Sequence, residues 1–319
     1  MSTENAKLEH LLAVWKADME AFAESFDIRD KELNIIPFVP TQPQKQVFST
    51  VSTSRKSFIL KGRQMFVTTA VAICALRDCL FKPGMRVCVA AHDDKAAIEV
   101  GQFYIALHAG HELLRELMPV VRSRDHKIVF GNGSKILIGT ANSEFWRGFP
   151  THFAHLTEAA LYDDMGKTLA SLGQTVPKNG TMVVESTAFG ENDFYHMWND
   201  KRSTYAKTFL CWKDHHEYRA KEPLPKDLTD DERRYIVAHG LDRDQASWYV
   251  LTRRSLPPDK LPMFDQEYPA TAEMAFLLSG NKFLSRQLKA PAPLPVEAGI
   301  TRLEQFDPKA QYIAGIDVA

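Results

Sequence analysis

Apolar residues along the chain form two kinds of segment: some have apolar positions at helical spacing, and others are short continuous apolar runs. Residues 8–26 carry apolar positions at helical spacing, which predicts one amphipathic helix. An apolar run at 57–60 precedes a short Gly/Arg/Gln loop and a long stretch without Gly or Pro, which is typical of strand, loop and helix. Residues 85–91 and the segment from His92 repeat this order. This alternation of strands and helices predicts an α/β fold built on a parallel sheet with right-handed crossovers.

Further apolar segments extend the predicted sheet. Residues 127–130 and 134–138 flank a Gly-Asn-Gly turn, which predicts a hairpin. Residues 153–157 form another apolar run, and 181–185 lead into a turn of small polar residues. Both segments are expected to be strands of the same sheet.

The pattern divides the chain into four parts. Residues 1–34 form an N-terminal helical segment, and 35–212 form the α/β core. Residues 213–288 are charged and helical in pattern and return to the core, with a capping-box pattern at Thr229. Residues 289–319 begin with a Pro-rich linker and end in a strand.

Composition narrows the class of protein. The 319 residues are 45% hydrophobic and 25% charged, which is enough for one large core or two smaller ones. The N-terminus lacks the layout of a signal peptide, and charges interrupt the longest apolar runs, so we expect a soluble protein of the cytoplasm. The four cysteines include no C-x-x-C pair and are expected to be free core thiols. A net charge of −1 means that any DNA contact is local and salt-sensitive.

The loop after the run at 57–60 carries the clearest candidate chemistry. A helix N-terminus binds phosphate through its unpaired N–H groups and its dipole. Lys61 and Arg63 add positive charge, and the hydroxyl of Thr68 is placed to reach a magnesium ion on the phosphates. The candidate nucleotide-binding loop comprises Lys61, Gly62, Arg63, Gln64, Met65, Phe66, Val67, Thr68 and Thr69.

The strict phosphate-loop pattern is absent from this stretch. Phe66 and Val67 occupy the Gly-Lys positions of G-x-x-x-x-G-K-[ST]. The alternative interpretation is an ordinary buried strand that leads into an apolar helix, with Lys61 and Arg63 as solvated charges.

Other candidate residues lie at predicted strand ends and turns. Gln44, in a short helix that begins at about residue 41 or 43, is a candidate for reading an adenine edge, and otherwise is a plain surface amide. Glu158 follows the run at 153–157, where ligands bind in open α/β sheets, and is a candidate catalytic base. Its alternative role is helix capping. Ser186 and Thr187 are candidates for sensing a γ-phosphate, or are ordinary turn residues.

From about residue 40 to 317, these segments resemble in consistent order the ATPase domain of a tailed-phage large terminase, the motor that pumps double-stranded DNA into the capsid. The segment Lys61-x-Arg63-Gln64-x-x-x-Thr68 resembles its deviant Walker A loop, in which the lysine stands at the front. Three further segments resemble its Walker B, its coupling motif and the end of its lid: His155-Leu-Thr-Glu-Ala-Ala160, Glu185-Ser-Thr-Ala-Phe-Gly190 and Phe276-Leu-Leu-Ser-Gly280.

The resemblance implies a P-loop NTPase of the RecA/ASCE type with a helical lid, which hydrolyses ATP with Mg²⁺. Lys61 and Arg63 would bind phosphates, Thr68 would hold the metal and Glu158 would orient the attacking water. Arg147 matches the arginine that completes the ATP site of a neighbouring subunit. The implied partners are double-stranded DNA, the portal protein of the procapsid, the small terminase subunit and further copies in a ring. The implied location is the cytoplasm of an infected bacterial host, with no membrane contact.

Three departures from the family pattern affect these expectations. Phe66 replaces a loop glycine at a backbone position where positive φ is expected. Thr157 replaces the Walker B aspartate, which leaves Thr68 and Glu158 as candidates to hold the metal. Asp317 would be the first metal-binding aspartate of a ribonuclease-H-like nuclease, but the chain stops after that strand, so no nuclease activity is expected.

Two alternative functions remain at this stage. A superfamily-2 helicase-like translocase shares these motifs but needs a second RecA-like domain. A non-catalytic nucleotide-gated scaffold is favoured by Phe66 and Thr157.

Overall fold

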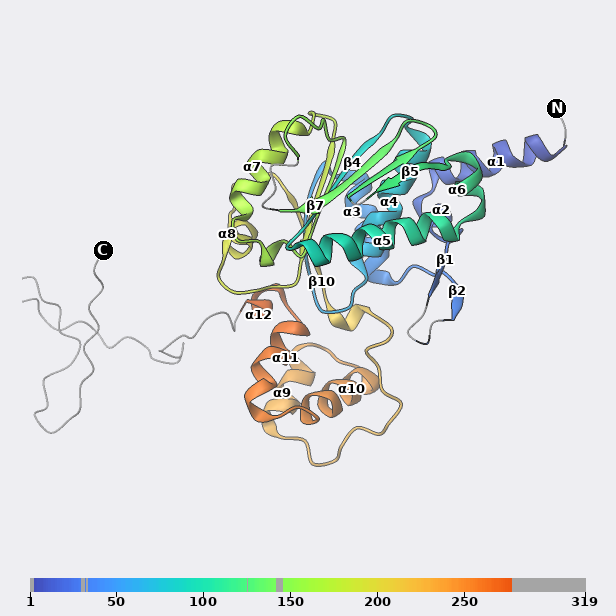
Figure 1. The fold of residues 1–319 in the computed structure, drawn as a ribbon. Helices are drawn as coiled ribbons and strands as arrows, with labels where there is room; N and C mark the ends of the chain where they lie inside the picture. The colour runs from blue at the N-terminus through green and yellow to red at the C-terminus, as the bar shows by residue number, and fades with distance from the viewer. Residues whose placement is uncertain (1–2, 30–31, 33, 125, 142–145, 277–319) are drawn as a thin grey trace, which may run out of the picture. The chain divides into compact units, whose positions relative to one another are not determined.

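An eight-stranded sheet organises the computed structural model (Figure 1). The model describes residues 3–276 apart from 30–31, 33, 125 and 142–145. The strand order is β10-β3-β9-β8-β4-β7-β6-β5. The parallel strands are β3 (Lys56–Lys61), β4 (Arg86–Ala91), β7 (Lys135–Thr140), β8 (Phe153–Thr157), β9 (Thr181–Ser186) and β10 (Ala206–Leu210). The antiparallel strands are β5 (Val120–Arg124) and β6 (Lys127–Phe130). The strands predicted between residues 57 and 185, the hairpin and the mainly parallel sheet are confirmed.

Two strands of this sheet, β5 and β10, were not predicted from the sequence. Every residue of β5 is exposed, and β10 buries only Leu210 fully, so neither strand shows the apolar pattern of a buried strand. Both lie at the edges of the sheet, where one side of the strand lacks a neighbour.

Helices bury the sheet on both faces. One hydrophobic cluster joins α3 (Gln42–Thr53), α4 (Val67–Phe81), α5 (Asp94–Gly110) and α6 (Glu112–Leu117) to one face. The other cluster joins α7 (Met165–Thr175) and α8 (Asp193–Asn199) to the opposite face. Successive residues of a central strand enter the two clusters in turn, as Val87 and Cys88 do in β4. Burial on both faces explains why the inner parallel strands have continuous apolar sequences.

The predicted single helix at 8–26 is wrong. The structure has two helices, α1 (Thr3–Ala17) and α2 (Met19–Ala23), which are separated at Asp18. The Asp18 carboxylate accepts hydrogen bonds from the backbone of Glu20 and Ala21, so it caps the second helix instead of continuing the first. A two-stranded antiparallel sheet follows, with β1 (Asp27–Arg29) and β2 (Ile35–Pro37).

The part of the chain described after β10 contains helices and turns but no further strand. The helices are α9 (Asp230–Ala238), α10 (Arg243–Arg254), α11 (Leu261–Glu267) and α12 (Ala272–Ala275). The predicted capping box is present, because Thr229 and Glu232 exchange backbone-to-side-chain hydrogen bonds at the start of α9. The expected linker, the motif that ends at Gly280 and the strand with Asp317 extend beyond the described residues and stay predictions.

One expectation from composition, that the cysteines are free core thiols, is confirmed by the described residues. Cys74, Cys79, Cys88 and Cys211 are free and buried. None of the described helices combines the length and the apolar character that a bilayer crossing requires.

Candidate active site

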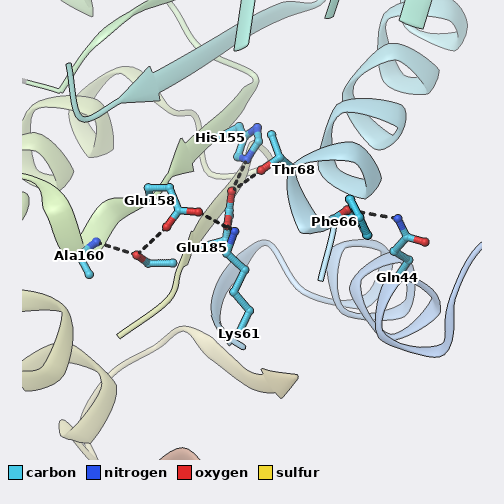
Figure 2. Close-up of polar contacts among 9 residues, drawn as sticks. Gln44, Lys61, Phe66, Thr68, His155, Glu158, Ala160 and Glu185 are labelled. Atoms are coloured by element: carbon cyan, nitrogen blue, oxygen red, sulfur yellow. Dashed lines mark hydrogen bonds and ion pairs between the residues drawn. The ribbon is translucent and has the colours of Figure 1, made fainter. Parts of the chain in front are cut away.

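Charged and polar side chains gather where three neighbouring parallel strands end. Lys61 is the last residue of β3, Glu185 lies near the end of β9, and Glu158 directly follows β8. These strands are adjacent in the order β3-β9-β8. In open α/β sheets, ligands bind at the carboxyl ends of the strands. Figure 2 shows the three side chains directed toward one another beside the first turn of α4.

One ammonium group bridges two carboxylates. Lys61 Nζ lies 2.8 Å from Glu158 Oε1 and 2.7 Å from Glu185 Oε2. The side chains of Lys61 and Glu185 are 8% and 0% exposed, whereas that of Glu158 is 31% exposed. The alternative interpretation of Lys61 as a solvated charge is therefore wrong.

Neighbouring charges keep the buried side chains of Lys61 and Glu185 ionised. Burial alone would lower the pKa of Lys61, but Glu185 and Glu158 raise it above its usual range. Burial alone would raise the pKa of Glu185, but the charge of Lys61 and the hydrogen bond from His155 lower it well below its usual range. The group formed by Lys61, Glu158 and Glu185 holds one positive charge against two carboxylates.

Glu185 is the centre of a buried polar network that the sequence interpretation missed. Its Oε1 accepts a hydrogen bond from Thr68 Oγ1 at 3.0 Å and lies 3.4 Å from His155 Nε2. The other ring nitrogen of His155 lies 3.1 Å from the hydroxyl of Tyr104. If the tyrosine donates to Nδ1, then Nε2 carries the proton and donates to Glu185. The available signal was an acidic residue inside an apolar run, because such residues are rarely buried without a partner.

The backbone around the site is strained. Among the described residues, the non-glycine residues with positive φ are Gln64 at 55°, Phe66 at 51° and Glu158 at 50°. The left-handed conformation costs a residue with a Cβ about 1–2 kcal/mol, and such strain clusters at functional sites. The positive φ expected at the position of Phe66 is confirmed.

Phe66 offers a matched test of this strain. Phe66→Gly should keep or raise the free energy of unfolding, because glycine adopts positive φ freely and the ring is 40% exposed. Phe66→Val should lower it by about 1–2 kcal/mol, since β-branched residues disfavour this conformation. Urea unfolding of both variants measures the difference. Equal stability of the two variants would contradict the importance of the backbone conformation.

Gln44 connects the preceding helix to the loop. It is 2% exposed, so the alternative of a plain surface amide is wrong. Its Oε1 accepts from the backbone N–H of Thr41 at 2.9 Å and completes the capping box of α3, which confirms the predicted helix start. Its Nε2 donates to the carbonyl of Phe66 at 3.2 Å (Figure 2). These contacts hold the loop, and the reading of adenine by Gln44 stays a prediction.

The helical segment after β10 contacts the candidate loop directly. Arg63 donates its backbone N–H to the carbonyl of Glu267 at 2.8 Å, and its guanidinium pairs with the carboxylate of Glu267. The hydroxyl of Tyr218 donates to the carbonyl of Arg63 at 2.6 Å. A Cβ on Gly62 would lie 3.3 Å from the carbonyl of Glu267, so the close approach favours glycine. The C-terminal end of α11 is therefore held against this loop.

The remaining predicted residues have distinct surroundings. Ser186 Oγ donates to Glu158 Oε2 at 3.4 Å and accepts from the backbone of Ala160 at 3.1 Å. Thr187, which follows β9, is half-buried, and so is Thr69 in the first turn of α4. Buried core positions are occupied by Met65 and Val67. Thr157 and Glu158 do not provide a side-chain cap to the short turn at 159–161 that follows them, so the capping interpretation is wrong.

Arg147 lies outside this group of strands. It is exposed in the connection between β7 and β8, after the undescribed residues 142–145. Its action on a neighbouring subunit stays a prediction.

Comparisons with known proteins show the fold. No model of a known protein family matches the chain, and no curated protein does. Among solved structures, the large terminase of bacteriophage HK97 is similar at a TM-score of 0.59, with 17% identity over 88% of this chain and 60% of that chain. The large terminase ATPase domain of Thermus phage P74-26 has 19% identity over 73% of this chain and 94% of that chain, with a TM-score of 0.49. The likeness to the HK97 protein confirms the predicted α/β fold.

Proposed function

We propose that this chain is the ATPase motor domain of a phage large terminase, which hydrolyses ATP with Mg²⁺ to drive double-stranded DNA into a procapsid. The observation that carries the proposal is the buried bridge of Lys61 between Glu158 and Glu185, beside the N-terminus of α4. The overall similarity to the HK97 large terminase supports it.

The site fits phosphoryl transfer, which depends on positioning and on neutralisation of charge. Lys61 and the backbone N–H groups at the start of α4 would bind the phosphates. Arg63 would join them after leaving Glu267. Glu158, once Lys61 has turned to the phosphates, has a free carboxylate oxygen to orient the attacking water, while Ser186 holds its other oxygen.

The residues present also fit a magnesium ion. Thr68 Oγ1 and the carboxylate of Glu185 lie together beside the loop, and Mg²⁺ prefers such oxygen ligands. No group of three or more His, Cys, Asp and Glu side chains suited to a metal occurs among the described residues. Mg²⁺ in nucleotide sites is held by one or two carboxylates and by substrate phosphates, so it needs no such group. When bound, the metal neutralises charge on the phosphate oxygens.

Hydrolysis of ATP measured with and without Mg²⁺ and double-stranded DNA tests the function. We expect release of phosphate that requires Mg²⁺ and increases with DNA, with the DNA effect reduced by salt. Binding without hydrolysis would favour the nucleotide-gated scaffold. Absence of both binding and hydrolysis would exclude the proposed function. For the helicase-like alternative, the described residues beyond β10 offer only helices in place of a second RecA-like sheet.

The proposed partners are double-stranded DNA, the portal protein, the small terminase subunit and further copies of this chain in a ring, in the cytoplasm of an infected bacterial host. In such a ring Arg147 would stabilise charge on the phosphoryl group transferred in the neighbouring site. Activity per molecule should therefore rise with protein concentration.

A mixing experiment tests this role of Arg147. Arg147→Ala and Glu158→Gln should each be inactive alone under ring-forming conditions. Mixed rings should regain part of the ATPase activity, because some sites combine an intact Glu158 with an intact Arg147 from the adjacent subunit. No recovery in the mixture, with activity per subunit independent of concentration, would assign Arg147 to its own subunit.

A further inference from the structure

Strand β9, which lies beside β8 in the sheet, places a carboxylate next to position 157. In P-loop NTPases a hydroxyl of the loop and a Walker B aspartate hold the metal. Here that position is Thr157, and its partner in the parallel register of β8 and β9 is Glu185. Residues paired in register point to the same face of a sheet. Glu185 therefore presents its carboxylate beside Thr157, and its Oε1 accepts from Thr68 Oγ1 at 3.0 Å.

Glu185 and Glu158 differ in their surroundings. Glu185 contacts the loop hydroxyl of Thr68, is 0% exposed, and is oriented by His155 and Tyr104 behind it. Glu158 is 31% exposed and contacts Lys61 and Ser186. Hydrogen-bonded partners behind a carboxylate fix its orientation, as they do for metal ligands in general. Glu158 is the more accessible to water.

Moving the ammonium of Lys61 away from Glu185 costs free energy unless another cation replaces it. Oε2 of Glu185 is buried, accepts no hydrogen bond of good geometry from the described residues, and lies 2.7 Å from Lys61 Nζ. If Lys61 turns to a phosphate, this oxygen becomes an unpaired buried charge, which is strongly unfavourable. A divalent cation between Oε2 and the phosphates would remove this cost.

We propose that Glu185, with Thr68, is the protein carboxylate that holds the divalent metal of the bound nucleotide, in place of the absent aspartate at position 157. In this structure, the ammonium of Lys61 lies at this cation position. The inference rests on the proposed function. It separates the two carboxylates, with Glu185 for the metal and Glu158 for the water.

Binding of Mn²⁺ to the ADP complex tests the assignment. Mn²⁺ replaces Mg²⁺ as a paramagnetic probe, and its free concentration is read by electron paramagnetic resonance. Glu185→Gln should weaken Mn²⁺ in the ADP complex by about 10-fold or more, since even changes behind a metal ligand cost about 10–100-fold. ADP affinity in EDTA should fall much less. The matched Glu158→Gln should keep the Mn²⁺ affinity of the wild type.

The outcomes distinguish this inference from the proposed function. Unchanged Mn²⁺ affinity in a folded Glu185→Gln variant would overturn the metal role of Glu185 while the ATPase proposal stands. If the wild-type chain binds no ADP, with or without Mn²⁺, both fail.

A second variant moves the carboxylate from position 185 in β9 to position 157 in β8. Thr157→Asp combined with Glu185→Gln should recover most of the Mn²⁺ affinity, because position 157 lies beside 185 on the same face. A merely structural role of Glu185 predicts no such recovery. If Glu185→Gln does not fold, Glu185→Asp keeps the charge with a shorter side chain and should still weaken Mn²⁺. Wild-type Mn²⁺ affinity in Glu185→Asp would then overturn the assignment.

Discussion

Glu158→Gln should bind ATP with nearly wild-type affinity and hydrolyse it roughly 100- to 10,000-fold more slowly, which is the usual contribution of a positioned general base. The amide has the size of the carboxylate, and its oxygen can keep the contact with Lys61. It cannot draw a proton from water as the carboxylate does. The two measurements are ATP affinity by fluorescence titration and phosphate release at saturating ATP.

Ser186→Ala provides the control for this prediction. It removes the hydrogen bond to Glu158 Oε2, at 3.4 Å, but leaves the carboxylate in place, so turnover should fall much less than in Glu158→Gln. An equal loss of binding and turnover in Glu158→Gln would make Glu158 a structural residue.

Lys61→Ala should lose most of its ATP affinity and also lower the free energy of unfolding by about 3–5 kcal/mol, because it leaves the buried carboxylate of Glu185 without its cation. Arg63→Ala should have smaller effects on both. The side chain of Arg63 is 52% exposed, and its pairing with Glu267 is accessible to solvent. Isothermal titration with ATP and thermal unfolding separate binding from stability. Unchanged ATP affinity in Lys61→Ala would shift the phosphate-binding role to Arg63.

The pH dependence of stability tests whether the unpaired charge of Glu185 causes the loss of stability when Lys61 is replaced. In the wild type the pKa of Glu185 lies below that of an unfolded glutamate, so its stabilisation is present above about pH 4.3 and is lost as the pH falls toward its folded pKa. In Lys61→Met, burial is no longer opposed by Lys61, and the pKa of Glu185 should rise. Lys61→Met should then be more stable at acid pH than at neutral pH, and it should lose stability as the pH rises through the pKa of Glu185 in the folded variant.

The comparison is the difference in Tm between wild type and Lys61→Met from pH 8 to pH 5. We expect this difference to shrink as the pH falls. Parallel Tm curves over this range would contradict a buried charge on Glu185 as the source of the destabilisation.

Local patterns in the sequence were sufficient for most of the elements. The order of strand, loop and helix around Lys61, the hairpin after residue 127, the helix start near residue 41 and the capping box at Thr229 all depend on neighbouring residues. The spacing of apolar residues and the preferences of the backbone act over a few positions, so they can be read directly. The helix break at Asp18 was missed because its carboxylate competes with helix continuation, although the apolar spacing continues.

The sequence alone determined the phosphate-loop candidates, the position of Glu158 after a strand and the positive φ expected at Phe66. Only the tertiary structure decided that Glu185 joins them. Thr68 and Glu185 are 117 positions apart, and they meet because β9 lies between β3 and β8 in the sheet. Strand order depends on how whole elements pack, which no local pattern encodes. The charge of a buried carboxylate likewise depends on the cation beside it, and that neighbour is known only once the chain has folded.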